Sequence, residues 1–205
     1  MSEKTLNNPS KARQRARWVA KAGILTAAAV VLMYLEFALP LMPTFLMFDF
    51  SEIVVLIASF SMGPLTGVLV ELAKNLLHLP ATHTGGVGEL ANFIIGSAFV
   101  GTAGLIYKRT KTQRNAYLGM AAGTAAMTVL ASLINYFFLI PFYIQVMGLP
   151  IEVIINMVHE SGNTLVNDQR SLILFVFVPF NLFKGIVISF IVALVYKRIS
   201  PLLHR

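Results

Sequence analysis

The sequence has no cysteine and little charge, and each shortage narrows what the protein can be. Without cysteine there are no disulfides, no cysteine nucleophile and no thiolate ligand for a metal ion. Charged residues make up only 12% of the chain, whereas 57% of its residues are hydrophobic. Because about a quarter of an average soluble domain is charged, most segments here cannot be half-buried surface helices. The composition therefore predicts an integral membrane protein.

Three sequence patterns are also missing, and they constrain the mechanism. No Gly-x-x-x-x-Gly-Lys-Ser/Thr phosphate loop occurs, so the chain does not hydrolyse nucleotides by that route. The basic residues are not interleaved with aromatic ones, so nucleic acid is not an expected partner. There is no obvious inverted repeat of the kind seen in many secondary transporters. A transporter built on this chain would draw its energy from other subunits.

Six apolar segments follow a polar N-terminal arm. Four of them are long enough for a helix to cross a bilayer core of ~30 Å, which takes about 20 residues. The two shorter ones are separated only by Gly63-Pro64, where glycine favours a helix end and proline a helix start. We therefore expect an all-α membrane protein of six transmembrane helices, two of them in a tight hairpin, at roughly 18–37, 50–62, 64–79, 88–107, 116–145 and 172–196.

The placement of basic residues predicts how the helices are oriented. All but three of the 16 lysines and arginines lie in the N-terminal arm and first turn, after the fourth segment, or at the C-terminus. With six spans these regions share one side, which the positive-inside rule makes cytoplasmic. We expect cytoplasmic N and C termini, an arm at 1–17, one membrane domain at 18–199 and a tail at 200–205. The net charge of +7 then reflects orientation and contact with anionic lipid.

The three remaining basic residues are Arg170, in the loop before the last segment, and Lys74 and Lys184, which fall within apolar segments. A charge inside a span costs about 2.5–3.5 kcal/mol on insertion scales, and such residues usually face a bundle interior or a wet cavity. At ~1.5 Å of rise per residue both lysines lie in the outer half of the membrane. We expect a single pocket open to the outside, formed by polar residues of several segments: Asp49, Glu52, Lys74, His78, Asn135, Asn181 and Lys184.

Some of these residues also have simpler explanations. Glu71 and Lys74 are three positions apart on one helix and can neutralise one another. Asn135 can be a hydrogen-bonding contact between helices. Lys184 has no acid on its own segment to pair with, which favours a functional role. A purely structural membrane subunit would have all of these groups paired with one another.

A metal site is a further alternative. His78, His83 and Glu89 are of the right residue types, but a proline and several glycines break the helical register between them. Two histidines in an outer loop are the more ordinary interpretation. A membrane-embedded metal-dependent enzyme therefore stays open as the less favoured alternative.

Two apolar features suggest contacts beyond the spans. The loop at 38–48 is too apolar for an ordinary solvated connection, and it is expected to fold back as a cap over the pocket. Gly23 and Ala27 give the first helix a small-residue face, which lets another helix approach closely. Packing inside the protein and docking of a partner subunit fit that spacing equally well.

Together these features resemble a known family, the substrate-binding S components of energy-coupling factor (ECF) transporters, and within it the riboflavin-specific members. The resemblance covers nearly the whole chain from Arg17 to Arg198. It is strongest over three stretches: Phe48-Asp49-Phe50-Ser51-Glu52 through Glu71, Lys74 and Asn75 to His78; Leu133-Ile-Asn135-Tyr136; and Pro179-Phe-Asn181-Leu-Phe-Lys184-Gly185.

The resemblance implies a multi-pass protein of a prokaryotic cell membrane that binds riboflavin from outside and reorients in the membrane to deliver it. Its partners would be a transmembrane coupling subunit and two cytosolic ATPases, and riboflavin would be cargo rather than a cofactor. By position, Asn181 and Lys184 would meet the polar edge of the isoalloxazine ring. Gly23, where the family often has alanine, and Ala27 would contact the coupling subunit. Residues near the ribityl chain, or shaping its surroundings, would be Asn135, Lys74, Asn75, Glu52 and Asp49.

The flavin's chemistry fits this assignment. The pyrimidine edge of isoalloxazine offers an acceptor, a donor and an acceptor; asparagine both donates and accepts, whereas lysine only donates. S components for thiamine, biotin or folate would keep the same fold and change the ligand, so they remain alternatives.

Overall fold

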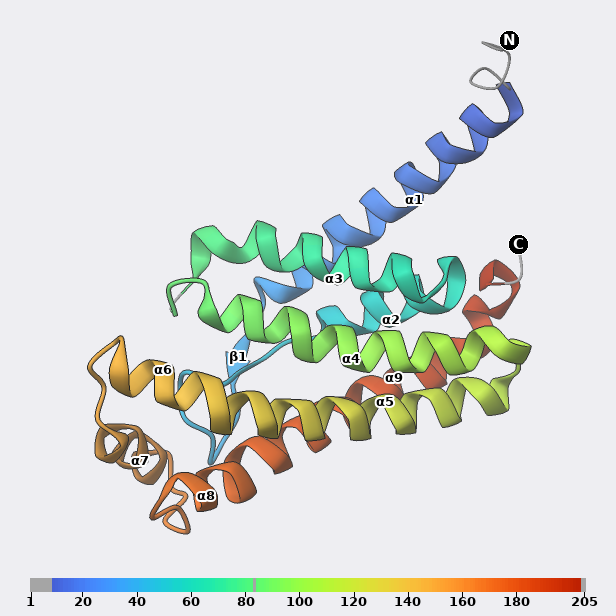
Figure 1. Cartoon of the computed structure of the whole chain (residues 1–205). Coiled ribbons are helices and arrows are strands. Elements are labelled where there is room, and N and C mark those ends of the chain that lie inside the picture. Colours follow the sequence, from blue (N-terminus) through green and yellow to red (C-terminus); the bar gives the residue numbers. More distant parts are fainter. Residues whose placement is uncertain (1–8, 83, 204–205) are drawn as a thin grey trace.

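The computed structural model describes residues 9–82 and 84–203, and this part of the chain is mostly helical. Four helical stretches are long and apolar enough to cross a membrane: Lys11–Met33, Val87–Thr110, Gln113–Gln145 and Gln169–Tyr196. Figure 1 shows α3, α4 and α5 running side by side, with α1 inclined to them; the main helices are as follows. They are α1 (Pro9–Met33), α2 (Ser51–Met62), α3 (Pro64–His78), α4 (Val87–Thr110), α5 (Gln113–Ile134) and α9 (Val178–Leu203).

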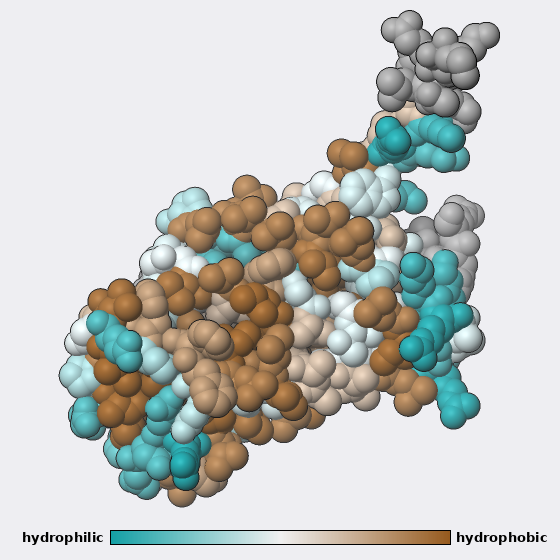
Figure 2. All heavy atoms as spheres, viewed as in Figure 1, coloured by the Kyte–Doolittle hydropathy of each residue, from teal (hydrophilic) through white to brown (hydrophobic). Residues whose placement is uncertain are grey.

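The ends of the bundle differ in composition from its flank. The α2–α3 and α4–α5 turns lie at the same end as the start of α1 and the end of α9 (Figure 1). Hydrophobic side chains cover the flank of the molecule, and hydrophilic ones gather toward its ends (Figure 2). Large apolar residues such as Ile24, Leu65 and Phe138 are about 70% exposed. Side chains of this kind on a helical flank suit a lipid environment rather than water.

The first helix differs from its prediction at both ends. α1 begins at Pro9, inside the stretch predicted as a separate arm, because residues 10–17 are mostly good helix formers and none of them breaks a helix. It ends at Met33 instead of residue 37. Phe37 and Ala38 form strand β1, which pairs antiparallel with β2 (Met47–Phe48), with Phe37 opposite Phe48. Because these two residues pair with β2, they are extended and do not continue the helix.

The predicted helical hairpin is confirmed. Gly63, between α2 and α3, has a φ of 101°, which side-chain-bearing residues rarely adopt, and Pro64 is the first residue of α3. The hairpin ends in a short 3₁₀ turn, η1 (Leu79–Ala81). Neither helix of this pair has the length of a full span.

The last two predicted helices contain π-helical turns. α5 continues through η2 (Asn135–Leu139) into α6 (Ile140–Gln145), and α8 (Gln169–Leu172) continues through η3 (Ile173–Phe177) into α9. Between α6 and α8, where the sequence predicted only a loop, lies α7 (Ile151–Glu160). α7 is too short to span and is amphipathic, with Ile154 and Val158 buried on one face.

Small residues bring α4 and α5 close together. A Cβ added at Gly119 or Gly123 would meet the carbonyl oxygen of Ala103 or Phe99 at 2.7 or 2.6 Å. The Gly-x-x-x-Gly spacing on α5 therefore permits backbone contact between the two helices. Buried apolar residues form two separate cores. One, around Val55, Phe99 and Val192, lies toward the turn end of the bundle, and the other joins α6, α7, α8 and η3.

Candidate functional site

A cavity opens at the end of the bundle opposite the α2–α3 and α4–α5 turns. With the part open to solvent included, its empty space amounts to about 1050 Å³. The β1–β2 segment supplies Phe45, Leu46 and Met47 to its wall, so the apolar loop does cap the cavity. The ring of Phe48 lies 5.2 Å from that of Phe50 and 5.8 Å from that of Phe183, which fastens the cap to α2 and α9.

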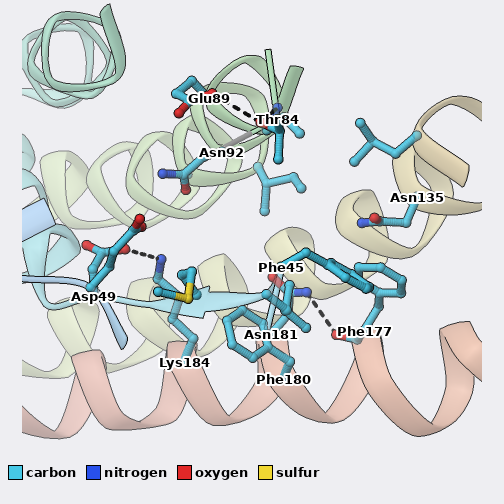
Figure 3. Close-up of a pocket in the computed structure, with 18 of the residues that line it drawn as sticks. Phe45, Asp49, Thr84, Glu89, Asn92, Asn135, Phe177, Phe180, Asn181 and Lys184 are labelled. Carbon is cyan, nitrogen blue, oxygen red and sulfur yellow. Dashed lines mark hydrogen bonds and ion pairs between the residues drawn. The ribbon is translucent and has the colours of Figure 1, made fainter. Parts of the chain in front are cut away.

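Asn135, Asn181 and Lys184, three of the five predicted binding residues in the cavity lining, come from η2 and α9. Asn181 and Lys184 lie three positions apart on one face of α9, and Asn135 approaches from η2 (Figure 3). Asn181 Nδ2 donates to the Phe177 carbonyl and Asn135 Nδ2 to that of Ala131, each at 2.8 Å. Each amide oxygen has no partner among the described residues, so each can accept a hydrogen bond from a ligand.

Asn135 is the first residue of η2, and Asn181 follows the end of η3 by four residues; a proline follows each of these π-helical turns. Pro141 has no N–H to offer the Tyr136 carbonyl, and Gln169 Nε2 donates to that carbonyl instead, at 2.7 Å. Pro179 likewise has no N–H to donate to the carbonyl of Phe175.

Asn163 Nδ2 donates to the Phe175 carbonyl at 3.2 Å. Side chains from the α7–α8 region thus satisfy both interruptions, as membrane helices require. Single π-turns of this kind often occur at functional sites.

Lys184 is held by a residue far away in the sequence. Its Nζ donates to Asp49 Oδ2 at 2.8 Å, and Asp49 Oδ1 accepts from the Ser51 backbone N–H at 2.8 Å. Both oxygens of Asp49 are therefore occupied. Lys184 has no other hydrogen-bond partner in the described part of the chain, and an ammonium has three N–H groups to donate. The pair fixes the direction of Lys184 and leaves it able to donate into the cavity.

Lys74 and Asn75 are also buried, but they do not line the cavity. Lys74 Nζ lies 2.7 Å from Ser51 Oγ, 2.6 Å from Glu52 Oε1 and 3.0 Å from Glu71 Oε2. Ser51 and Glu52 accept hydrogen bonds from the ammonium, whereas Glu71 forms an ion pair with it and its Oε2 has no hydrogen-bond partner among the described residues. The pairing with Glu71 expected from their spacing is present, and Glu52 adds a second carboxylate.

Glu52 connects this buried cluster to the cavity. Its Oε1 is held by Lys74, whereas Oε2 is buried without a hydrogen-bond partner among the described residues, and the residue lines the cavity. A buried carboxylate oxygen without a donor costs free energy, so it is suited to accept a hydrogen bond from a bound molecule. A Cβ at Gly96 would collide with the carboxylate of Glu71 and lie 3.0 Å from Glu52 Oε1, so the cluster needs glycine there.

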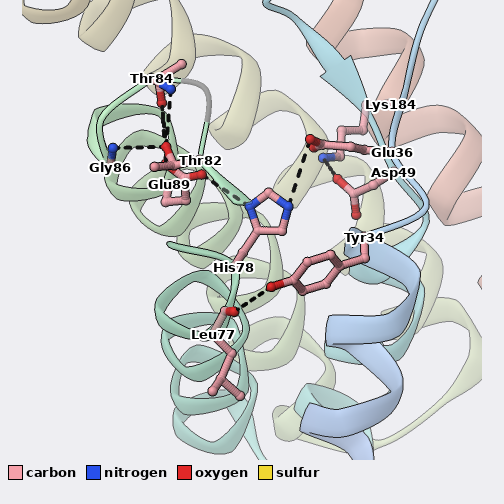
Figure 4. A network of polar contacts seen from close by, with 10 residues as sticks. All are labelled: Tyr34, Glu36, Asp49, Leu77, His78, Thr82, Thr84, Gly86, Glu89 and Lys184. Atoms are coloured by element: carbon pink, nitrogen blue, oxygen red, sulfur yellow. Dashed lines mark hydrogen bonds and ion pairs between the residues drawn. The ribbon is translucent and has the colours of Figure 1, made fainter. Parts of the chain in front are cut away.

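A second polar network lies at the edge of the cavity (Figure 4). His78 Nδ1 lies 3.2 Å from Glu89 Oε1, and His78 Nε2 lies 3.9 Å from Glu36 Oε1. Thr82 Oγ1 and Thr84 Oγ1 donate to Glu89 Oε2 at 2.8 and 3.3 Å, which ties the α3–α4 loop to α4.

Sequence reasoning did not assign several of these cavity residues to the pocket: Glu36, Thr84, Glu89 and Asn92. A signal was present in the two threonines preceding Glu89, because hydroxyls at that spacing can bond to a following carboxylate. The described residues contain no group of three or more His, Cys, Asp or Glu arranged to hold a metal, and His83 of the metal alternative lies outside them.

Gly23 and Ala27 lie on an exposed face of α1, which leans away from the bundle at its N-terminal end (Figure 1). A Cβ added at Gly23 would meet no atom within 4 Å. The glycine is therefore not explained by packing inside this chain.

Comparisons by sequence and by structure relate this chain to the same family of known proteins. The family model of the ECF transporter substrate-specific component matches residues 17–196. The riboflavin transporter RibU of Staphylococcus aureus is 34% identical over 182 residues, covering 89% of each chain. The riboflavin transporter FmnP of Bacillus subtilis is 32% identical, covering 89% of this chain and 91% of FmnP. A solved S component of a bacterial ECF transporter superposes with a TM-score of 0.72 at 32% identity, covering 93% of this chain and 99% of that one.

Proposed function

Because the chain belongs to the family of ECF transporter substrate-specific components, we propose that it is the riboflavin-binding subunit of an ECF-type importer. It is a substrate-binding protein and not an enzyme, and riboflavin is its cargo. The observation that carries the proposal is the cavity, where the donors and acceptors of Asn135, Asn181 and Lys184 stand among apolar walls. That combination matches a flat, largely apolar ring with one polar edge.

In this proposal, different buried residues bind different parts of the ligand. Asn181 and Lys184 meet the pyrimidine edge of the ring, the amide donating and accepting and the ammonium donating. Asn135 and Glu52 Oε2 take the ribityl hydroxyls, which can donate to both. Asp49 acts through Lys184 because both of its oxygens already accept hydrogen bonds, and Lys74 with Asn75 acts through Glu52 because neither of the two lines the cavity.

The topology that accompanies this function has six membrane-crossing helices, namely α1, α2, α3, α4, the α5–α6 stretch and the α8–α9 stretch. The exposed basic residues at the start of α1 and around the α4–α5 turn support a location of that end in the cytoplasm of a prokaryotic cell. The cavity then opens outward, with one membrane domain at 18–199 between the short arm and tail. Gly23 and Ala27 offer α1 to a transmembrane coupling subunit, which works with two cytosolic ATPases.

The first test is the absorbance of the protein purified from cells grown in rich medium. A yellow chromophore with a flavin spectrum is expected to copurify. Titration of ligand-free protein with thiamine, biotin and folate beside riboflavin distinguishes the other vitamins. Colourless protein that fails to quench riboflavin fluorescence would contradict the proposal.

The site itself is tested by Asn181→Leu. Loss of the amide leaves the ring edge without its paired donor and acceptor, so riboflavin should bind about tenfold more weakly or worse. Asn156→Leu, on the exposed face of α7, is the matched control and should bind normally. Unchanged affinity in Asn181→Leu would remove the role given to that residue.

A further inference from the structure

A groove runs between α5 and α9 on the flank of the bundle, and it shares no lining residue with the cavity described above. With the part open to its surroundings included, its empty space amounts to about 750 Å³. Most of the side chains along it are apolar, and those of Ile186 and Phe190 are more than 60% exposed. The groove therefore faces lipid. Its lining residues are Tyr117, Met120, Ala121 and Thr124 of α5 and Ile186, Ser189, Phe190 and Ala193 of α9.

The groove has the depth of one leaflet of a bilayer. At its inner end α5 touches α9, because a Cβ added at Gly185 would meet Thr124 at 2.5 Å. Toward the α4–α5 turn, the same face of α5 carries Ala121, Tyr117 and then Arg114, at spacings of three and four residues. At ~1.5 Å of rise per residue, Arg114 lies about 15 Å along the helix from Thr124. A bilayer core of ~30 Å gives each leaflet about that thickness, so an acyl chain fits the groove lengthwise.

The end of the groove at the α4–α5 turn carries unmatched positive charge. No aspartate or glutamate occurs in the sequence between Glu89 and Glu152. Hydrophilic side chains gather at this end of the molecule, beside the apolar flank (Figure 2). Basic groups at such a boundary attract anionic lipid headgroups. Those around the turn are exposed and form no ion pair with any described residue: Lys108, Arg109, Lys111 and Arg114.

A polar atom in the groove wall is also unmatched. Ser189 Oγ is buried and has no hydrogen-bond partner among the described residues. A buried hydroxyl without a partner costs free energy, and the ester carbonyl of a phospholipid can accept its hydrogen bond. The groove is also remote from the helix proposed to meet a coupling subunit, because α1 packs against α2 and α3 on the other side of the bundle (Figure 1). Lipid can therefore occupy the groove while that partner is bound.

We propose that the groove between α5 and α9 binds an acyl chain of an anionic phospholipid, whose phosphate is held by Arg114. The arginine side chain extends along the groove toward the headgroup level, and a guanidinium can form two parallel hydrogen bonds to a phosphate. A zwitterionic phospholipid fills the groove equally well, but its own cationic group offsets the phosphate charge. Headgroup charge therefore decides which lipid is preferred. The site is independent of the ligand that the cavity binds.

Native mass spectrometry of the delipidated full chain in detergent tests the site. The protein is incubated with dioleoyl phosphatidylglycerol or dioleoyl phosphatidylcholine, which have the same acyl chains and differ in headgroup charge. One basic residue near an anionic headgroup favours binding by about fivefold, so the phosphatidylglycerol should be retained at least about fivefold better. Equal retention of the two lipids would overturn the proposal.

Arg114→Gln tests the headgroup contact. Retention of phosphatidylglycerol should fall by about fivefold, toward that of phosphatidylcholine. Arg170→Gln replaces an exposed arginine in α8, toward the other end of the bundle, and is the matched control that should keep the wild-type preference. An unchanged preference in Arg114→Gln would show that the arginine does not hold the phosphate.

Ala121→Leu tests the groove itself. The added side chain occupies space that the acyl chain needs, so retention of both lipids should fall by about threefold or more. Ala125→Leu is the matched control, since Ala125 is also an exposed alanine of α5 but lies outside the groove lining. Equal retention by these two variants would place the lipid elsewhere and overturn the assignment. A mass of two protein copies that is lost in Ala121→Leu would assign the groove to a second copy and overturn it as well.

Discussion

Two lysines lie in apolar helices of this protein and look alike in sequence, yet their surroundings differ. Lys74 on α3 is fully buried, and its ammonium is matched by Ser51, Glu52 and Glu71. Lys184 on α9 is 6% exposed, contacts a single carboxylate, that of Asp49, and lines the cavity.

The two lysines differ in how many of their N–H groups remain without an acceptor in the protein. A buried lysine surrounded by several acceptors of the protein itself stabilises the arrangement of the helices around it. A buried lysine with one partner still has donors, and the arrangement is complete only when something else accepts them. Burial alone therefore does not indicate a binding residue in this protein; an unmatched donor or acceptor that also lines the cavity does.

The largest effect should come from Lys74→Met. Removing the ammonium leaves Glu52 and Glu71 buried together without a counter-charge, which should cost about 3–5 kcal/mol of folding stability. Thermal unfolding of the purified protein in detergent, with size-exclusion profiles, measures the loss. A Lys74→Met protein that unfolds like wild type but no longer binds ligand would reverse the roles of the two lysines.

Lys184→Met should act on binding more than on folding. Asp49 keeps the Ser51 backbone N–H as a partner, so the unfolding temperature should stay nearer to wild type than that of Lys74→Met. A lost charge-assisted hydrogen bond to ligand is worth about 1.5–3 kcal/mol, which corresponds to a roughly 10-fold to 100-fold weaker affinity for riboflavin. Fluorescence titration measures it. Full affinity in Lys184→Met would show that the lysine serves only Asp49.

Much of this arrangement follows from local sequence. The cost of a charge in a span singled out Lys74 and Lys184, the Gly63-Pro64 pair predicted the hairpin, and the apolar loop predicted the cap. Five of the residues predicted to bind ligand do line the cavity: Asp49, Glu52, Asn135, Asn181 and Lys184.

The rest depends on contacts between distant segments. Spacing along one helix pairs Lys74 with Glu71, but Glu52 reaches the same ammonium from α2. That second contact, made by a residue that also lines the cavity, cannot be read from helical periodicity. α7 was missed because ten amphipathic residues between two spans resemble a loop in a search for long apolar runs.

The smallest predicted effect concerns the packing around Lys74, Glu52 and Glu71. Two glycine substitutions test whether these side chains are as tightly enclosed as their contacts indicate. Alanine normally favours a helix over glycine by up to about 1 kcal/mol, and Gly101→Ala on α4, whose new Cβ would lie 3.8 Å from Val68, should show that gain. Gly96→Ala, on the same helix, should instead lose about 1 kcal/mol, because its Cβ displaces the Glu71 carboxylate and crowds that of Glu52. Paired unfolding curves measure the difference. If both alanine variants are equally stabilised, the carboxylates have room to move, and Lys74 is less strictly confined than Lys184.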